Sequence, residues 1–174
     1  EAVYKEKELE EMDVMFLMDR FGYAKTIDMN TYERNKEAVA AENKYVFKCK
    51  NTGKICLFTD AGQLHMIKVP DLPFGKFRDK GTPIDNVSNY SSEKEDIVFI
   101  TNQTELNLCR VLFVTKQSMM KVVDGGEFDV TKRTVAATKL QDDDKVLSII
   151  CLHDQKNIVL QSKEGYFLRF PIDD

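Results

Sequence analysis

Short apolar runs recur along the chain, each followed by a polar turn and a second apolar run. The runs are strand-sized and rich in β-branched and aromatic residues, which favours strands over helices. The pattern occurs four times, at residues 16–27, 57–67, 113–123 and 160–170. Turn residues of successive copies lie 40, 56 and 47 positions apart. A period of about 40–50 residues is typical of the blades of a propeller-like array.

The turn inside each copy has a residue suited to a tight hairpin. Gly22, Gly62 and Gly165 hold this position in the first, second and fourth copies. Glycine adopts a positive φ without steric cost, as many hairpin turns require. The third copy has Ser118 instead, so we expect its turn to be of another type.

Further strands lie between the copies, and their spacing predicts three more hairpins. Residues 45–50 alternate, with Tyr45, Phe47 and Cys49 on one face of the strand. A short polar segment separates the two strands of each pair. The predicted pairs are 45–50 with 54–58, 96–100 with 110–114, and 145–151 with 158–160.

Many of these strands are apolar on both faces, which is unusual for an antiparallel sheet with one face in water. Such strands are expected where each sheet lies between two neighbours, as propeller blades do. We therefore predict an all-β fold of about four antiparallel blades over residues 13–174, either an incomplete disc or an open arc. Residues 1–12 are highly charged and predict a linker or entry arm, and residues 88–96 predict a loop.

Composition agrees with one globular domain. Of the 174 residues, 43% are hydrophobic and 31% charged, which is too apolar for a disordered chain. No run approaches the roughly 20 apolar residues of a membrane helix, so no membrane partner is expected. The chain begins with Glu1 rather than Met, and we expect it to be a piece of a longer protein.

Charge is distributed unevenly. The net charge is −4, but residues 44–80 hold 8 basic and 3 acidic residues, a net of +5. The flanking segments are acidic, at −5 for residues 1–43 and −4 for residues 81–174. Salt screens charges over about 10 Å, so a local basic surface can bind a polyanion on an acidic protein. The alternative is a solvated strand face without a ligand.

Residues that commonly carry enzyme chemistry form no recognisable site. The sequence has neither a G-x-x-x-x-G-K-[ST] nor a G-x-S-x-G motif. Its four cysteines lie in or beside apolar runs without C-x-x-C spacing, as expected of reduced core thiols in a cytosolic protein. His65 and His153 lack a neighbouring nucleophile and are predicted to be structural or solvated. We expect no catalytic residue and no metal site, and the acidic run 142–144 predicts a charged turn.

Basic residues give the strongest candidate site because they recur at equivalent places. Lys25, His65 and Lys121 each follow the turn residue by three positions. A row of cations around a curved edge suits bent duplex DNA, through phosphate contacts that are independent of base sequence and weakened by salt. The alternative is that these cations only keep exposed strands soluble. The candidate phosphate-contact residues are Arg20, Lys25, Lys48, Lys50, Lys68, Lys76, Arg78, Lys80, Lys121, Lys132 and Arg133.

The repeats resemble the blade motif of the C-terminal domain in the A subunit of bacterial type IIA topoisomerases, which are DNA gyrase and topoisomerase IV. The similarity is carried by FLMDRFGYAKTIDMNTY at 16–32, CLFTDAG at 56–62, KGTPIDN at 80–86 and KEGYFLRF at 163–170. It implies a β-pinwheel, a propeller-shaped disc whose blades exchange strands and whose basic outer edge bends or wraps DNA.

The resemblance also implies a role without catalysis in this domain. Cleavage belongs to a tyrosine in an upstream domain, and Mg²⁺ and ATP serve other parts of the holoenzyme. The implied partners are double-stranded DNA, the ATPase B subunit, plus the rest of the A subunit. The implied location is the bacterial cytoplasm, in association with the nucleoid.

Two departures from the family pattern bear on the role. A complete domain has five or six blades, more than this chain supplies. Gyrase carries a basic, glycine-rich box of the type Q-R-R-G-G-K-G in its first blade, where residues 33–44 here read ERNKEAVAAENK. This difference favours a topoisomerase IV-like role, or a box outside the chain. The rival functions are a propeller-like protein-interaction module without DNA binding and an enzyme with a small-molecule pocket.

Overall fold

The computed structural model describes residues 10–153, 157–161 and 167–171, with side chains described for residues 10–153. Within these residues the strands form four antiparallel sheets, which we call blades 1 to 4. Blade 1 contains, in spatial order, β3 (Tyr45–Lys50), β1 (Asp13–Met18), β2 (Tyr23–Asp28) and β6 (Thr82–Pro83). Blade 2 contains β7 (Ile97–Asn102), β4 (Lys54–Thr59), β5 (Gln63–Lys68) and β10 (Thr134–Ala136). Blade 3 contains β11 (Val146–Leu152), β8 (Arg110–Thr115) and β9 (Met120–Asp124), and blade 4 contains β12 (Asn157–Gln161) and β13 (Phe167–Pro171).

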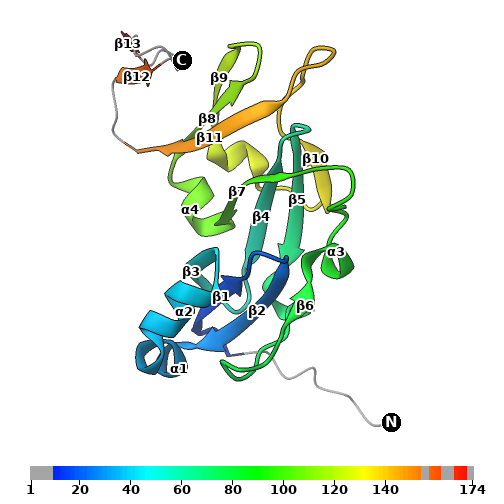
Figure 1. Cartoon of the computed structure of the whole chain (residues 1–174), viewed down its shortest axis with the longest axis vertical. Coiled ribbons are helices and arrows are strands. Elements are labelled where there is room, and N and C mark those ends of the chain that lie inside the picture. Colours follow the sequence, from blue (N-terminus) through cyan, green and yellow to red (C-terminus); the bar gives the residue numbers. More distant parts are fainter. Residues whose placement is uncertain (1–9, 154–156, 162–166, 172–174) are drawn as a thin grey trace.

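Each blade is built around one predicted repeat. The hairpins β1–β2, β4–β5, β8–β9 and β12–β13 coincide with the four copies of the sequence pattern. Blades 1, 2 and 3 follow one another along the longest axis of the molecule (Figure 1). The all-β class and the propeller-like arrangement of antiparallel blades are therefore confirmed.

Neighbouring blades exchange strands, so the three additional hairpins predicted from the sequence are wrong. β3 pairs with β1 and not with β4, β7 pairs with β4 and not with β8, and β11 pairs with β8 and not with β12. The physical reason is packing. By pairing with β1, β3 places Tyr45, Phe47 and Cys49 on the apolar cluster shared by blades 1 and 2, and this non-local burial prevails over a local hairpin.

The blades pack face to face, which explains strands that are apolar on both sides. Phe16 of β1 and Leu57 of β4 meet in the cluster between blades 1 and 2. Phe58, the next residue of β4, lies in the cluster between blades 2 and 3. Leu17, the next residue of β1, packs in a third cluster against helices. The expectation that each sheet lies between two neighbours is thus confirmed for blade 2.

Two short helices that the sequence analysis did not predict cover the outer face of blade 1: α1 (Met29–Arg34) and α2 (Lys36–Glu42) (Figure 1). Asp28 caps α1, and its Oδ1 accepts a hydrogen bond from the Thr31 N–H at 2.6 Å. This bond holds the pKa of Asp28 below its usual value. Val39 of α2 is fully buried in the third cluster. The remaining short helices are η1 (Val69–Asp71), α3 (Ile84–Val87), α4 (Gln103–Asn107) and η2 (Gly125–Phe128).

The third hairpin turn is of the same type as the first two, contrary to the prediction. Ser118 has φ +62°, beside +84° for Gly22 and +75° for Gly62. The N–H of Ser118 donates to the Thr115 carbonyl at 3.0 Å, as that of Gly62 does to the Thr59 carbonyl at 3.1 Å. Pairing in the hairpin therefore imposes a left-handed backbone on a serine.

We expect Ser118→Gly to raise the free energy of unfolding by roughly 0.5–1 kcal/mol. A side chain in the left-handed region costs about 1–2 kcal/mol, and the greater freedom of glycine in the unfolded chain offsets part of the gain. Urea denaturation of this variant measures the change. Ser118→Ala, which keeps the Cβ atom, is the control and should not stabilise. Equal effects of the two substitutions would contradict a cost from the backbone conformation.

Candidate nucleic-acid interface

Two loops carry five of the candidate cations, and each loop leads into the outermost strand of a blade. The first rim loop (residues 74–81) precedes β6, and the second rim loop (residues 129–133) precedes β10. β6 and β10 close their sheets on the edge opposite β3 and β7, and both lie on the same side of the molecule (Figure 1). The exposed cations of these loops are Lys76, Arg78, Lys80, Lys132 and Arg133.

The first rim loop is fixed at both ends to β2. At its start, the Gly75 N–H donates to the Thr26 carbonyl at 3.1 Å, and the Thr26 N–H donates to the Pro73 carbonyl at 2.9 Å. At its end, Thr82 pairs with Ala24. The first rim loop, which follows the second repeat in sequence, is therefore hydrogen-bonded to the first blade. A hydrogen bond within the loop also stabilises its conformation, because the Asp79 carboxylate accepts the Lys76 N–H at 2.9 Å.

Lys25 lies between the two fixed ends and beneath the loop. Its Nζ donates to the carbonyl oxygens of Phe77 and Asp79 and lies 5.5 Å from the centre of the Phe77 ring. Partial burial lowers the pKa of Lys25, and the nearby Asp79 carboxylate opposes that shift. This candidate therefore binds the loop in the present structure, whereas the loop cations themselves are exposed.

The second rim loop is joined to blade 2 in a similar way. The Met66 N–H donates to the Arg133 carbonyl at 2.7 Å, and Lys54 Nζ donates to the Val130 carbonyl at 3.2 Å. Lys68, another candidate, is exposed and lies directly opposite Lys54 in the β4–β5 hairpin. The sequence analysis missed Lys54. Pairing residues outward from the hairpin turn at Gly62 places Lys54 opposite Lys68.

Four candidates lie away from these two loops. Lys48 and Lys50 are on β3, at the opposite edge of blade 1 from β6. Their Nζ atoms lie 3.9 and 2.8 Å from the carboxylate oxygens of Asp13, and the hydrogen bond from Lys50 lowers the pKa of Asp13. Arg20 lies in the β1–β2 turn, and Lys121 is exposed on β9. The structure thus does not gather all candidates into one surface.

The recurring basic position does not form a continuous row. Lys25, His65 and Lys121 occupy the same register, opposite Leu17, Leu57 and Phe113 respectively. However, the His65 residue is only 3% exposed.

His65 is buried and structural, which is one of the two alternatives predicted for it. Its Nε2 lies 2.9 Å from a carboxylate oxygen of Glu95, and its Nδ1 lies 2.9 Å from the Thr134 hydroxyl. Thr134 belongs to β10 and Glu95 to the loop before β7, so the imidazole joins both outer segments of blade 2 to β5. The row of cations is interrupted there.

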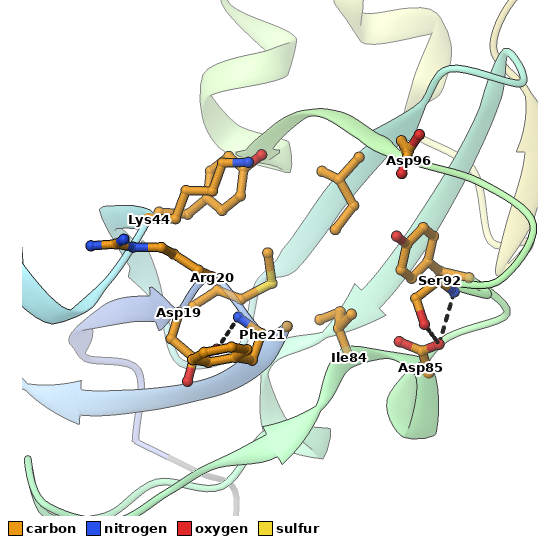
Figure 2. A pocket seen from close by; sticks show the side chains of 13 residues that line it. Asp19, Arg20, Phe21, Lys44, Ile84, Asp85, Ser92 and Asp96 are labelled. Carbon is orange, nitrogen blue, oxygen red and sulfur yellow. Dashed lines mark hydrogen bonds between the residues drawn. The ribbon is translucent and has the colours of Figure 1, made fainter.

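A pocket of about 370 Å³ opens between the β1–β2 turn and the loop before β7 (Figure 2). Two of its three carboxylates accept hydrogen bonds from neighbouring residues of the lining. The Asp19 carboxylate accepts the Phe21 N–H at 2.9 Å, and the Asp85 carboxylate accepts the N–H and hydroxyl of Ser92 at 2.9 and 2.8 Å. The pocket lining contains neither histidine nor cysteine.

Three of the four cysteine thiols are core residues. Cys49, Cys56 and Cys109 are buried free thiols, and Cys151 is half-buried. Burial raises the pKa of Cys49 and of Cys56 to about 12. Over the described part of the chain, no group of three or more His, Cys, Asp or Glu side chains could hold a metal ion. None of the helices described is both long and apolar enough to span a membrane.

The chain is similar in sequence to the C-terminal domain and the A subunit of DNA gyrase. The model of the DNA gyrase C-terminal domain, beta-propeller, matches residues 110–153 and 156–174. The A subunit of DNA gyrase from Lawsonia intracellularis is 27% identical over 173 residues, which cover 93% of this chain and 21% of that protein. The chain spans about a fifth of the length of the curated relatives it matches.

Solved structures share the fold. The C-terminal domain of DNA topoisomerase IV has a TM-score of 0.79 at 20% identity, covering 94% of this chain and 53% of that one. The E. coli ParC C-terminal domain has a TM-score of 0.71 at 15% identity, covering 91% of this chain and 64% of that one. These matches confirm the resemblance to the C-terminal β-pinwheel domain of the topoisomerase A subunit.

Proposed function

We propose that this chain is a non-catalytic domain of a bacterial type IIA topoisomerase A subunit, and that it binds and bends duplex DNA along its outer edge. The observation that carries the proposal is the placement of the two rim loops. Five exposed cations precede the outer strands of neighbouring blades on one side of the molecule. Cations at intervals along one edge suit phosphate contacts that position DNA without reading its sequence.

In the holoenzyme, the domain guides duplex DNA toward strand passage and so contributes to the control of supercoiling. The rest of the A subunit supplies the cleaving tyrosine, and the B subunit hydrolyses ATP. Mg²⁺ and ATP act in those parts, and this domain needs no cofactor. The assembly works in the bacterial cytoplasm, in association with the nucleoid.

The segment where gyrase carries its basic box has no excess of basic residues in this chain. Residues 33–44 hold three basic and three acidic residues, and most of them belong to α1 and α2. A neutral helical segment offers little attraction to phosphates. We therefore infer that this domain guides DNA in the manner of topoisomerase IV, unless a basic box lies in a part of the protein outside this chain.

A salt titration tests the proposed function. Binding of this chain to a labelled random-sequence duplex is followed by fluorescence anisotropy at about 50 and about 200 mM salt. Five phosphate contacts give a slope of about −4.5 in log affinity against log salt, so affinity should fall about 500-fold over this range. Duplexes of different sequence should bind equally.

Two further results test DNA bending and DNA binding separately. Energy transfer between dyes on the duplex ends should rise on binding if the domain bends DNA. Absence of binding at about 50 mM salt would overturn the proposal in favour of a protein-interaction module.

A further inference from the structure

The ammonium group of Lys25 is bonded to the backbone of the first rim loop. An ammonium group has three N–H donors. Two directions are taken by the carbonyl oxygens of Phe77 and Asp79, and the Phe77 ring lies 5.5 Å from the nitrogen. A phosphate that approached Lys25 would compete with these two carbonyl oxygens for the ammonium group. Its sequence position among the recurring cations therefore does not make it a phosphate contact.

The loop presents its cations outward because its inner side is held. Phe77 is half-buried and packs on the apolar cluster under α1 and α2. Its neighbours Lys76 and Arg78, and Lys80 two positions further on, are exposed. With both loop ends fixed on β2, the bonds from Lys25 hold the centre. We propose that Lys25 is a positioning residue, which orders the first rim loop so that its three cations meet DNA phosphates.

Blade 2 supports this assignment with a different lysine. Lys54 of β4 donates to the Val130 carbonyl in the second rim loop, and that loop carries Lys132 and Arg133. In both blades, a half-buried lysine of the hairpin bonds to the backbone of the loop that supplies the exposed cations. Lys25 and Lys54 lie on different strands of their hairpins, so the arrangement does not follow from the repeat alone.

A loop that is ordered before binding raises DNA affinity without adding phosphate contacts. Without Lys25 the loop cations still reach phosphates, but the loop must be ordered at the moment of binding, which weakens the complex. The number of phosphate contacts, and hence the salt slope, stays the same. A residue that touched phosphate directly would instead lower the magnitude of the slope by about 0.9 when removed.

The inference rests on the proposed DNA binding, and a double-mutant cycle tests it. Lys25→Met should weaken DNA binding about tenfold with an unchanged salt slope. In a chain that already has K76Q, R78Q and K80Q, the same substitution should change affinity less than twofold, because no loop cations remain to be positioned. Equal losses in both backgrounds, or a slope reduced by about 0.9, would overturn the proposal.

Lys121→Met is the matched control. Lys121 occupies the same register position in blade 3 and is exposed. Its removal should cost the same in both backgrounds.

A second measurement does not depend on DNA. Trypsin cleaves after lysine and arginine, so cleavage after residues 76, 78 and 80 should be at least about tenfold faster in Lys25→Met than in the unchanged chain. Unchanged cleavage rates would reject the role of Lys25 in ordering the loop. If the unchanged chain bound no DNA, the proposed function would fail, and the cleavage rates would still decide whether Lys25 holds the loop. A urea denaturation curve shows that each variant is folded.

Discussion

Reversing the three exposed cations of the first rim loop is expected to remove most of the DNA affinity. The variant K76E/R78E/K80E should bind random-sequence duplex at least about 10³-fold more weakly at about 50 mM salt. Three phosphate contacts are lost, so the magnitude of the salt slope should fall by about 2.7, and the new carboxylates repel the phosphates. Fluorescence anisotropy at several salt concentrations measures both quantities.

A charge-matched control separates this surface from a general effect of net charge. Lys36, Lys94 and Lys116 are exposed and lie in α2, in the loop of residues 88–96 and in the β8–β9 turn. The variant K36E/K94E/K116E has the same net charge as the rim variant and should lose less than about tenfold in affinity. Similar losses in the two variants would mean that DNA responds to overall charge, and the rim assignment would be abandoned.

The largest loss of stability is expected from Gly125→Ala. Gly125 begins η2, where this segment passes over the end of α4, and its N–H donates to the Cys109 carbonyl at 2.9 Å. A Cβ atom there would lie 1.8 Å from the Leu106 carbonyl oxygen and 2.7 Å from that of Cys109. Both obstacles are backbone atoms, which cannot rotate away. Separating η2 from α4 would also disturb the cluster that contains Leu106 and Phe128.

We therefore expect Gly125→Ala to lower the free energy of unfolding by about 3 kcal/mol or more. The melting temperature should fall by about 10 °C, as measured by circular dichroism. The next residue provides the control, because a Cβ atom on Gly126 meets only a side-chain oxygen of Asp124, at 3.4 Å. Gly126→Ala should cost less than about 1 kcal/mol. Similar melting temperatures for both variants would contradict the steric explanation.

The sequence predicted the hairpin of each blade but not the connections between blades. The segment after β3 illustrates the reason. The Gly53 N–H donates to the Lys50 carbonyl at 3.0 Å, so the chain makes a tight turn where the pattern predicts one. However, the turn joins two sheets instead of two strands of one sheet. Turn signals are local, whereas the choice of partner strand depends on burial between distant segments.

The candidate phosphate-contact residues were predicted only in part, for a similar reason. The basic segment 44–80 contains the cations of the first rim loop, but Lys25 looks no different in sequence from Lys121. Their environments differ because a loop about 50 residues further along the chain folds back over Lys25 and not over Lys121. The helices were missed because they are short and bury little. Val39 is the only buried residue of α1 and α2, so no apolar periodicity marks them.

The exchange of strands also determines how tension in a bound duplex would be carried. The first rim loop is hydrogen-bonded to blade 1, but along the chain it lies between β5 and β7, which both belong to blade 2. A force on this loop is therefore divided between two blades, through hydrogen bonds in one and covalent bonds in the other. The second rim loop links blades 2 and 3 in the same manner. Stretching forces along the outer edge thus act on interlocked sheets, and none of blades 1 to 3 can separate without breaking hydrogen bonds in a neighbouring blade.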